Sequence, residues 1–116
     1  MSYNYNDPKI WGPYYWFVFH TITLNYPLNQ NIVCKKKYYN FIQTIPLLLP
    51  NENISNNFAN LLDKYPVTPY LDSRESFVKW MHFIHNNINE LLEKENMPYE
   101  TFIDNYNKYY KPQKIK

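Results

Sequence analysis

Prolines, rather than glycines, punctuate this chain, which has nine prolines and a single glycine. Between the prolines, apolar residues recur at spacings of three and four, and no segment shows the apolar–polar alternation of a strand. The clearest periodic stretch contains Phe77, Trp80, Met81, Ile84, Ile88, Leu91 and Leu92. The sequence therefore predicts an all-α protein, a four-helix bundle plus a short fifth helix.

The prolines indicate where several helices begin or end. Pro13 suits the first turn of a helix over residues 11–26. Pro46 lies inside a second periodic stretch, residues 34–49, and should kink that helix or end it early. Pro98 opens the last short helix, whose inward residues would be Phe102, Ile103 and Tyr106.

Polar residues mark the other boundaries. Asn51 is a plausible N-cap for a helix with Phe58, Leu61 and Leu62 on its apolar face. Asp72 and Glu75 resemble a capping box ahead of the long helix. The proline-rich residues 65–69 are expected to form a loop without helix.

Length and charge limit the classes of protein that need to be considered. A chain of 116 residues forms one domain, here divided into an N-terminal extension (1–10), a helical domain (11–110) and a tail (111–116) expected to be disordered. The net charge of +2 is too small to favour nucleic acid as a partner. No apolar run approaches the roughly 20 residues of a membrane span. The polar residues 1–7 do not resemble a secretory signal, so we expect a cytoplasmic location.

Cysteine and histidine usage excludes two kinds of site. The single cysteine, Cys34, rules out an intrachain disulfide. A zinc site would need His20, His82 and His85 to converge with Cys34, and no spacing supports such convergence, so no metal site is predicted. The chain also lacks the pattern of a catalytic triad, a phosphate-binding glycine loop or a carboxylate pair.

Two groups of polar and aromatic residues are candidates for a ligand site. Trp80, His85, Asn86 and Asn89 lie on the long helix, where an imidazole, two amides and an indole are costly to bury without partners. A planar heteroaromatic ligand such as a flavin or adenine would supply them, whereas the periodicity alone favours a polar stripe facing water. The same choice holds for the first helix, whose Trp11, Tyr15, Trp16, Phe19 and His20 could form core packing or a cofactor site.

The order of these motifs resembles the Erv/Alr family of FAD-linked sulfhydryl oxidases. The matching residues are Trp11-Gly12-Pro13, Trp16 and His20, then Tyr26-Pro27, Leu49-Pro50, Ser73-Arg74, Trp80, His85-Asn86, Asn89 and Lys94. The resemblance implies a helical bundle that holds FAD at one end, usually as a homodimer. The residues that it implies around FAD are Trp11, Trp16, His20, Tyr26, Trp80, His85, Asn86, Asn89 and Lys94.

The chain departs from the family at its reactive segment. Where family members have Cys-x-x-Cys-x-x-His after Leu-Pro, this chain has Asn51, Ile54 and Asn57. The reaction needs one thiolate to attack the flavin and a second thiol to take electrons from the substrate, and neither Asn nor Ile can do this. We expect Cys34, about one helix length upstream, to be inert. The sequence thus predicts a pseudoenzyme without catalytic residues.

Three functions follow from this reading. The first is a degenerate sulfhydryl-oxidase fold, with or without bound FAD. It would act as a structural, assembly or binding module, either as a homodimer or packed into a larger assembly. The second is a flavin-dependent thiol oxidase with O₂ as acceptor and a dithiol supplied by a partner. The third is a bundle in which Trp16, His20, Trp80 and His85 pack on one another and fill the flavin space. Short stand-alone members of the family resemble those of large DNA viruses, which makes a virion component the expected setting.

Overall fold

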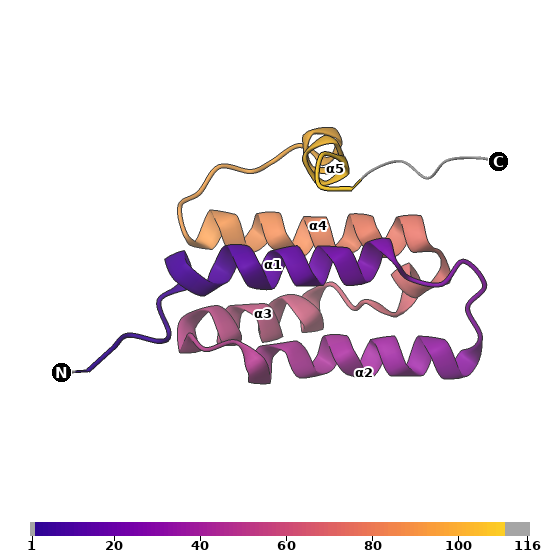
Figure 1. Ribbon diagram of the computed structural model, residues 1–116. Helices are drawn as coiled ribbons and strands as arrows, with labels where there is room; N and C mark the ends of the chain where they lie inside the picture. The colour runs from indigo at the N-terminus through magenta and orange to yellow at the C-terminus, as the bar shows by residue number, and fades with distance from the viewer. Residues whose placement is uncertain (1, 111–116) are drawn as a thin grey trace.

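The computed structural model describes residues 2–110, and these form six helical elements and no strand. The elements are α1 (Pro8–Leu24), α2 (Ile32–Leu48), α3 (Glu52–Lys64), the 3₁₀ helix η1 (Thr68–Asp72), α4 (Arg74–Leu91) and α5 (Tyr99–Asn107). Figure 1 shows α1 to α4 as a bundle, with the short α5 crossing above it. The predicted four-helix bundle with a fifth helix is confirmed.

The bundle is built from pairs of neighbouring helices around one apolar core. α1 packs on α4, α2 packs on α3, and α3 also contacts α4. Fully buried side chains from α2, α3 and α4 meet at its centre: Ile42, Ile45, Phe58, Phe77, Met81 and Ile84. α5 adds Phe102, which is also buried. Among residues 2–110, none of the helices is both long enough and apolar enough to cross a bilayer.

The first helix begins earlier than predicted, within the expected N-terminal extension. The Asp7 side chain accepts a hydrogen bond from the Lys9 amide (3.0 Å), and Pro8 occupies the first turn. Pro13 therefore lies inside α1. Because proline has no backbone N–H, α1 lacks one hydrogen bond there, the one to the carbonyl of Lys9, which is an exposed residue. The helix ends at Leu24, two residues before the predicted end.

Of the two effects predicted for Pro46, a kink or an early end of the helix, the second does not occur. α2 continues past Pro46 to Leu48, so the proline does not end the helix early. The carbonyl of Pro46 is used near the helix end, because it accepts hydrogen bonds from the Leu49 amide (3.4 Å) and the Ser55 hydroxyl (2.5 Å). The second of these bonds joins the end of α2 to the first turn of α3.

The boundary between η1 and α4 also differs from the prediction. Residues 65–69 are not entirely without helix, because Pro69 sits in the first turn of η1. The N-cap of α4 is Ser73, whose hydroxyl accepts from the Ser76 amide (3.0 Å), and not Asp72. Asp72 pairs instead with Lys35 of α2 (2.8 Å).

Two predicted helix starts are confirmed. Asn51 caps α3 through its side-chain oxygen, which accepts from the Ile54 amide at 3.0 Å. Pro98 precedes α5, whose Phe102 is buried and whose Ile103 and Tyr106 are half-buried. The predicted disordered tail, 111–116, lies outside the described residues.

Candidate functional site

Two adjoining hollows lie at one end of the bundle, where α1 and α4 meet the segment after α4. The first hollow has a volume of about 240 Å³, and its wall includes Trp11, Trp16, Leu49, Ile54 and Ile88. The second hollow has a volume of about 370 Å³ and lies under α5, with Phe17, His82, Met97, Phe102 and Tyr109 in its wall. Both hollows are lined by Pro13, His85, Asn89, Lys94 and Tyr106. Together they reach the size of a small-molecule site.

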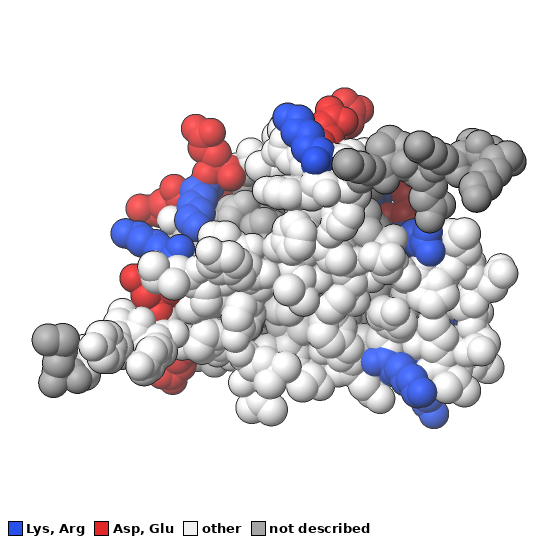
Figure 2. Space-filling model, in the orientation of Figure 1, with Lys and Arg blue, Asp and Glu red and all other residues white. Residues whose placement is uncertain are grey.

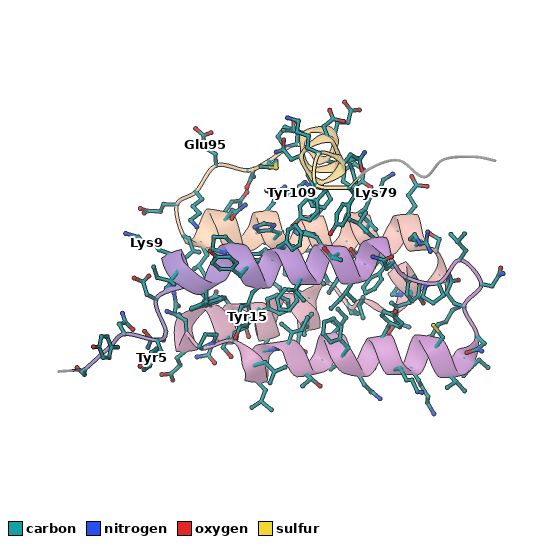
Figure 3. The ribbon with its side chains drawn as sticks, viewed as in Figure 1. Tyr5, Lys9, Tyr15, Lys79, Glu95 and Tyr109 are labelled. Carbon is teal, nitrogen blue, oxygen red and sulfur yellow. The ribbon has the colours of Figure 1, made fainter. Side chains whose placement is uncertain are left out.

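Aromatic packing holds α5 over the second hollow. Phe17 of α1 stacks on Tyr106, with 5.5 Å between the ring centroids, and meets Tyr109 edge-on at 5.3 Å. The Tyr106 hydroxyl donates to the carbonyl of Trp16 (3.3 Å). Figure 3 shows Tyr109 between α5 and the bundle. Tyr106 is predicted from its spacing to lie on the inward face of the last helix, but no motif marks it as a site residue.

His85, in the wall shared by both hollows, belongs to a compact group of one indole and two imidazoles. The rings of Trp16 and His85 are nearly parallel, with an interplanar angle of 6° and 4.0 Å between their centroids. His85 Nδ1 and His20 Nε2 lie 2.8 Å apart and share a hydrogen bond. Trp16 also stacks on His20, with 5.7 Å between centroids. These side chains come from α1 and α4, the two helices that pack most extensively.

Burial keeps both histidines uncharged. It lowers the pKa of His20 from 6.5 to about 2, with smaller contributions from neighbouring His85 and His82. Burial, with smaller contributions from the nearby His82 and Lys94, also lowers the pKa of His85 to about 3. At neutral pH the pair therefore carries no positive charge. Lys94 supplies a positive charge to both hollows, and Glu95 supplies a negative charge to the second.

A helix-ending turn brings Lys94 to the hollows. The Lys94 amide donates to the Asn89 carbonyl (2.7 Å) and the Glu93 amide donates to the Glu90 carbonyl (3.1 Å). These are the two bonds of a Schellman motif, and Glu93 occupies its left-handed position with a φ of 58°. Glycine usually takes this position, and with glutamate there no sequence signal marks the turn. Without it, the chain would not return Lys94 to the wall beside Asn89.

The structure brings five of the nine predicted flavin residues together in the walls of the hollows: Trp11, Trp16, His85, Asn89 and Lys94. His20 lies behind His85 and lines neither hollow. Asn86 also lies outside both walls and fastens the chain after α4, because its side chain donates to the carbonyl and accepts from the amide of Met97, both at 3.0 Å.

The remaining two predicted residues lie in the core. The hydroxyl of fully buried Tyr26 donates to the Leu71 carbonyl (2.7 Å). The indole of Trp80 is also buried, donates to the Tyr65 carbonyl (3.0 Å) and packs on Phe77. Neither residue lines the hollows. Trp16, His20 and His85 contact one another as the third sequence-based hypothesis expected, whereas Trp80 contacts Phe77.

The positions where the family resemblance would place the cysteines lie beside the first hollow. Asn51 caps α3, and Ile54 is 3% exposed with its side chain in the wall of the first hollow. The Asn57 amide donates to the Asn53 carbonyl within α3 (2.8 Å). Cys34, in the first turn of α2, is half-buried and lines neither hollow. An aliphatic side chain therefore occupies the place from which a thiol would reach a ligand.

Comparisons with known proteins point to one family. The model of the Erv1 / Alr family matches residues 13–110. A probable FAD-linked sulfhydryl oxidase of Acanthamoeba polyphaga mimivirus is 37% identical over 109 residues, which are 93% of this chain and 76% of the viral protein. A putative FAD-linked sulfhydryl oxidase of Invertebrate iridescent virus 6 is 30% identical over 97 residues, covering 79% of this chain and 87% of the relative.

Two solved structures of yeast Erv1 share the helical fold of this chain. The crystal structure of the yeast Erv1 core superposes with a TM-score of 0.77 at 21% sequence identity, covering 96% of this chain and 89% of the other. A mutant of Erv1 from Saccharomyces cerevisiae gives a TM-score of 0.80 at 19% identity, covering 95% and 92%. At these identities the likeness concerns the helical fold.

Proposed function

Because the chain belongs to the Erv1/Alr family, we propose that it is a flavin-binding member that has lost the thiol reaction and serves as a binding or structural module. Its relatives are FAD-linked sulfhydryl oxidases by name, and its single cysteine fits the loss of the redox disulfide. One observation carries the proposal: Ile54 closes the first hollow at the position of a family cysteine, beside the capping Asn51.

The residues of the two hollows suit an FAD molecule. Trp11, Trp16 and Tyr106 offer flat apolar walls, as a planar ring system needs. His85 Nε2 has no hydrogen-bond partner within residues 2–110, and Lys94 adds a positive charge that suits a diphosphate. Bound FAD would supply a two-electron acceptor. The chain itself supplies no vicinal dithiol to reduce it.

The test is a flavin titration followed by an oxygen-uptake assay on the same sample. We expect the purified protein to carry a flavin absorption band, or to gain one when FAD is added. We also expect no dithiothreitol-dependent oxygen consumption above that of free FAD. Oxygen uptake at enzyme-like rates would contradict the proposal and favour the second candidate, an oxidase that works with an external dithiol. An absent flavin band after FAD addition would leave only the scaffold role.

A matched pair of variants ties the flavin to this site. Lys94→Ala removes the ammonium group from the wall of both hollows and should weaken FAD binding roughly tenfold, since a hydrogen bond to a charged group contributes about 1.5–3 kcal/mol. Lys37→Ala changes the net charge equally at an exposed position of α2 and should leave binding unchanged. Equal weakening in both variants would indicate a nonspecific charge effect.

We also propose that α1 and α2 form a self-association surface. Ile10, Tyr14 and Val18 repeat every four residues along α1 and are 68%, 74% and 52% exposed, which leaves an apolar stripe in water. Figure 2 shows few charged side chains on the face over α1 and α2. We expect a dimer by light scattering, and a monomer for Tyr14→Glu. A monomeric parent protein would contradict this part of the proposal, and Tyr39→Glu on α2 tests whether that helix takes part.

The setting we propose for this module is a viral particle or its assembly. The support is that relatives with 37% and 30% identity come from a mimivirus and an iridescent virus. A protein that retains the fold but lacks the dithiol would contribute contact surfaces to such an assembly and no thiol oxidase activity. The apolar stripe of α1 is the surface available for it.

A further inference from the structure

We propose that His20 is a positioning residue that fixes the proton of His85, so that the site presents an uncharged N–H donor to its ligand. His20 is fully buried and lines neither hollow, so it does not contact a ligand bound there. Its only side-chain hydrogen bond within residues 2–110 joins its Nε2 to His85 Nδ1 at 2.8 Å. The influence of His20 on the site therefore passes through His85.

The hydrogen bond permits two arrangements of protons. If His20 Nε2–H donates, His85 accepts at Nδ1 and carries its hydrogen at Nε2. If His85 Nδ1–H donates, His20 accepts at Nε2 and must carry its one ring hydrogen at Nδ1, which is buried and has no partner in the described part of the chain. A buried N–H without an acceptor is among the least common arrangements in folded proteins. The first arrangement leaves only an unpaired acceptor at His20 Nδ1 and places both rings in the tautomer that free imidazole side chains prefer.

The packing around the two rings holds this arrangement in place. Trp16 covers one face of His85 at 4.0 Å, and Phe102 contacts His20 with 4.5 Å between centroids, so neither ring is free to turn over. The Lys94 ammonium group lies close enough to disfavour a second proton on His85. With Nδ1 occupied by His20, the other nitrogen of His85 remains for a ligand in the hollows that His85 lines.

This assignment defines the ligand atom that His85 recognises. A neutral Nε2–H donor requires an acceptor, such as a ring carbonyl, a ring nitrogen or a phosphate oxygen. Lys94 next to it favours an acceptor that carries negative charge. The ligand part of the inference rests on the proposed binding of FAD, whereas the proton assignment does not.

Nitrogen-15 NMR of the purified protein tests the proton assignment directly. The chain has three histidines, and long-range proton–nitrogen correlations distinguish Nδ1–H, Nε2–H and charged rings. His20→Gln and His82→Gln assign the signals. We expect His85 with its proton on Nε2 at pH 7. A proton on Nδ1 of His85, or a charged ring, would overturn the inference whether or not the protein binds FAD.

Two substitutions at position 20 test the influence on the ligand. His20→Gln retains an amide N–H near the former Nε2 and should keep FAD affinity within a few-fold of the parent protein. His20→Phe fills the space without a donor, so His85 should become a mixture of tautomers and FAD affinity should fall roughly tenfold. Equal FAD affinity in folded His20→Phe and in the parent protein would overturn the positioning role. If no variant binds FAD, the proposed flavin site fails while the NMR result on His85 still stands.

Discussion

Cysteines introduced together at positions 51 and 54 are expected to give this protein a thiol oxidase activity. Thiol-dependent oxygen uptake by Asn51→Cys/Ile54→Cys should exceed that of the parent protein by roughly a hundredfold or more, because a missing step is supplied rather than improved. The assay is oxygen consumption with dithiothreitol and added FAD, and the flavin band should bleach when oxygen is excluded.

The local geometry of α3 favours this outcome. Asn51 is the N-cap and Ile54 is the third residue of α3, so the two positions are one helical turn apart. Cβ atoms at this spacing lie about 5–6 Å apart, and a small adjustment allows a disulfide. Thiols at a helix N-terminus have a lowered pKa, which raises the thiolate fraction that attacks the flavin. The side chain at position 54 already lies in the wall of the first hollow.

The double substitution lowers the free energy of unfolding, so its control variant must lose a similar amount. Loss of the Asn51 cap should remove about 1 kcal/mol, and truncation of buried Ile54 about 1–3 kcal/mol. Asn51→Ser/Ile54→Ser carries similar losses without thiols and should show no activity. Ile54→Cys alone provides no disulfide partner and should not turn over. A double variant that binds FAD and forms its disulfide, yet stays inactive, would show that the hollow no longer offers the flavin to position 54.

The bundle could be predicted from the sequence because its helices carry local signals. The apolar repeat from Phe77 to Ile88 buries as the periodicity indicates, and Asn51 and Pro98 start their helices as expected. The errors arose where two residues competed for one role. Asp7 with Pro8 outweighed Pro13 as the start of α1, and Ser73 rather than Asp72 capped α4. Local preference cannot rank such competitors, because the choice depends on tertiary partners such as Lys35 for Asp72.

The candidate site was harder to predict because a motif does not say which way a side chain faces. Tyr26 and Trp80 belong to the same ordered motifs as Trp16 and His85, yet their polar atoms bond to the carbonyls of Leu71 and Tyr65 in the core. Tyr106 comes from a helix held to the bundle by side chains, and its contact with Phe17 spans most of the chain. Such long-range contacts leave no periodic signal in a single sequence.

The buried histidine pair should make this protein sensitive to mild acid. The folded-state pKa values of His20 and His85, about 2 and about 3, lie below the value of 6.5 expected for the unfolded chain. Below pH 6.5 the unfolded state therefore binds more protons than the folded state, so the free energy of unfolding decreases as the pH falls. Above that pH both states hold these rings uncharged, and the free energy of unfolding is independent of them. Burial lowers the pKa of His82 as well, which adds to the effect in the same direction.

The expected loss is large for a domain of this size. Each buried histidine removes about 1.4 kcal/mol of unfolding free energy per pH unit once the unfolded chain is protonated, so the pair removes about 4 kcal/mol between pH 5.5 and 4. Small domains have about 5–15 kcal/mol in total, and acid unfolding near pH 4 is the expected result. Urea unfolding followed by tryptophan fluorescence at a series of pH values measures the slope. His20→Gln removes one titrating ring and should reduce that slope by about half, whereas an unchanged slope would mean that His20 is protonated within the folded protein.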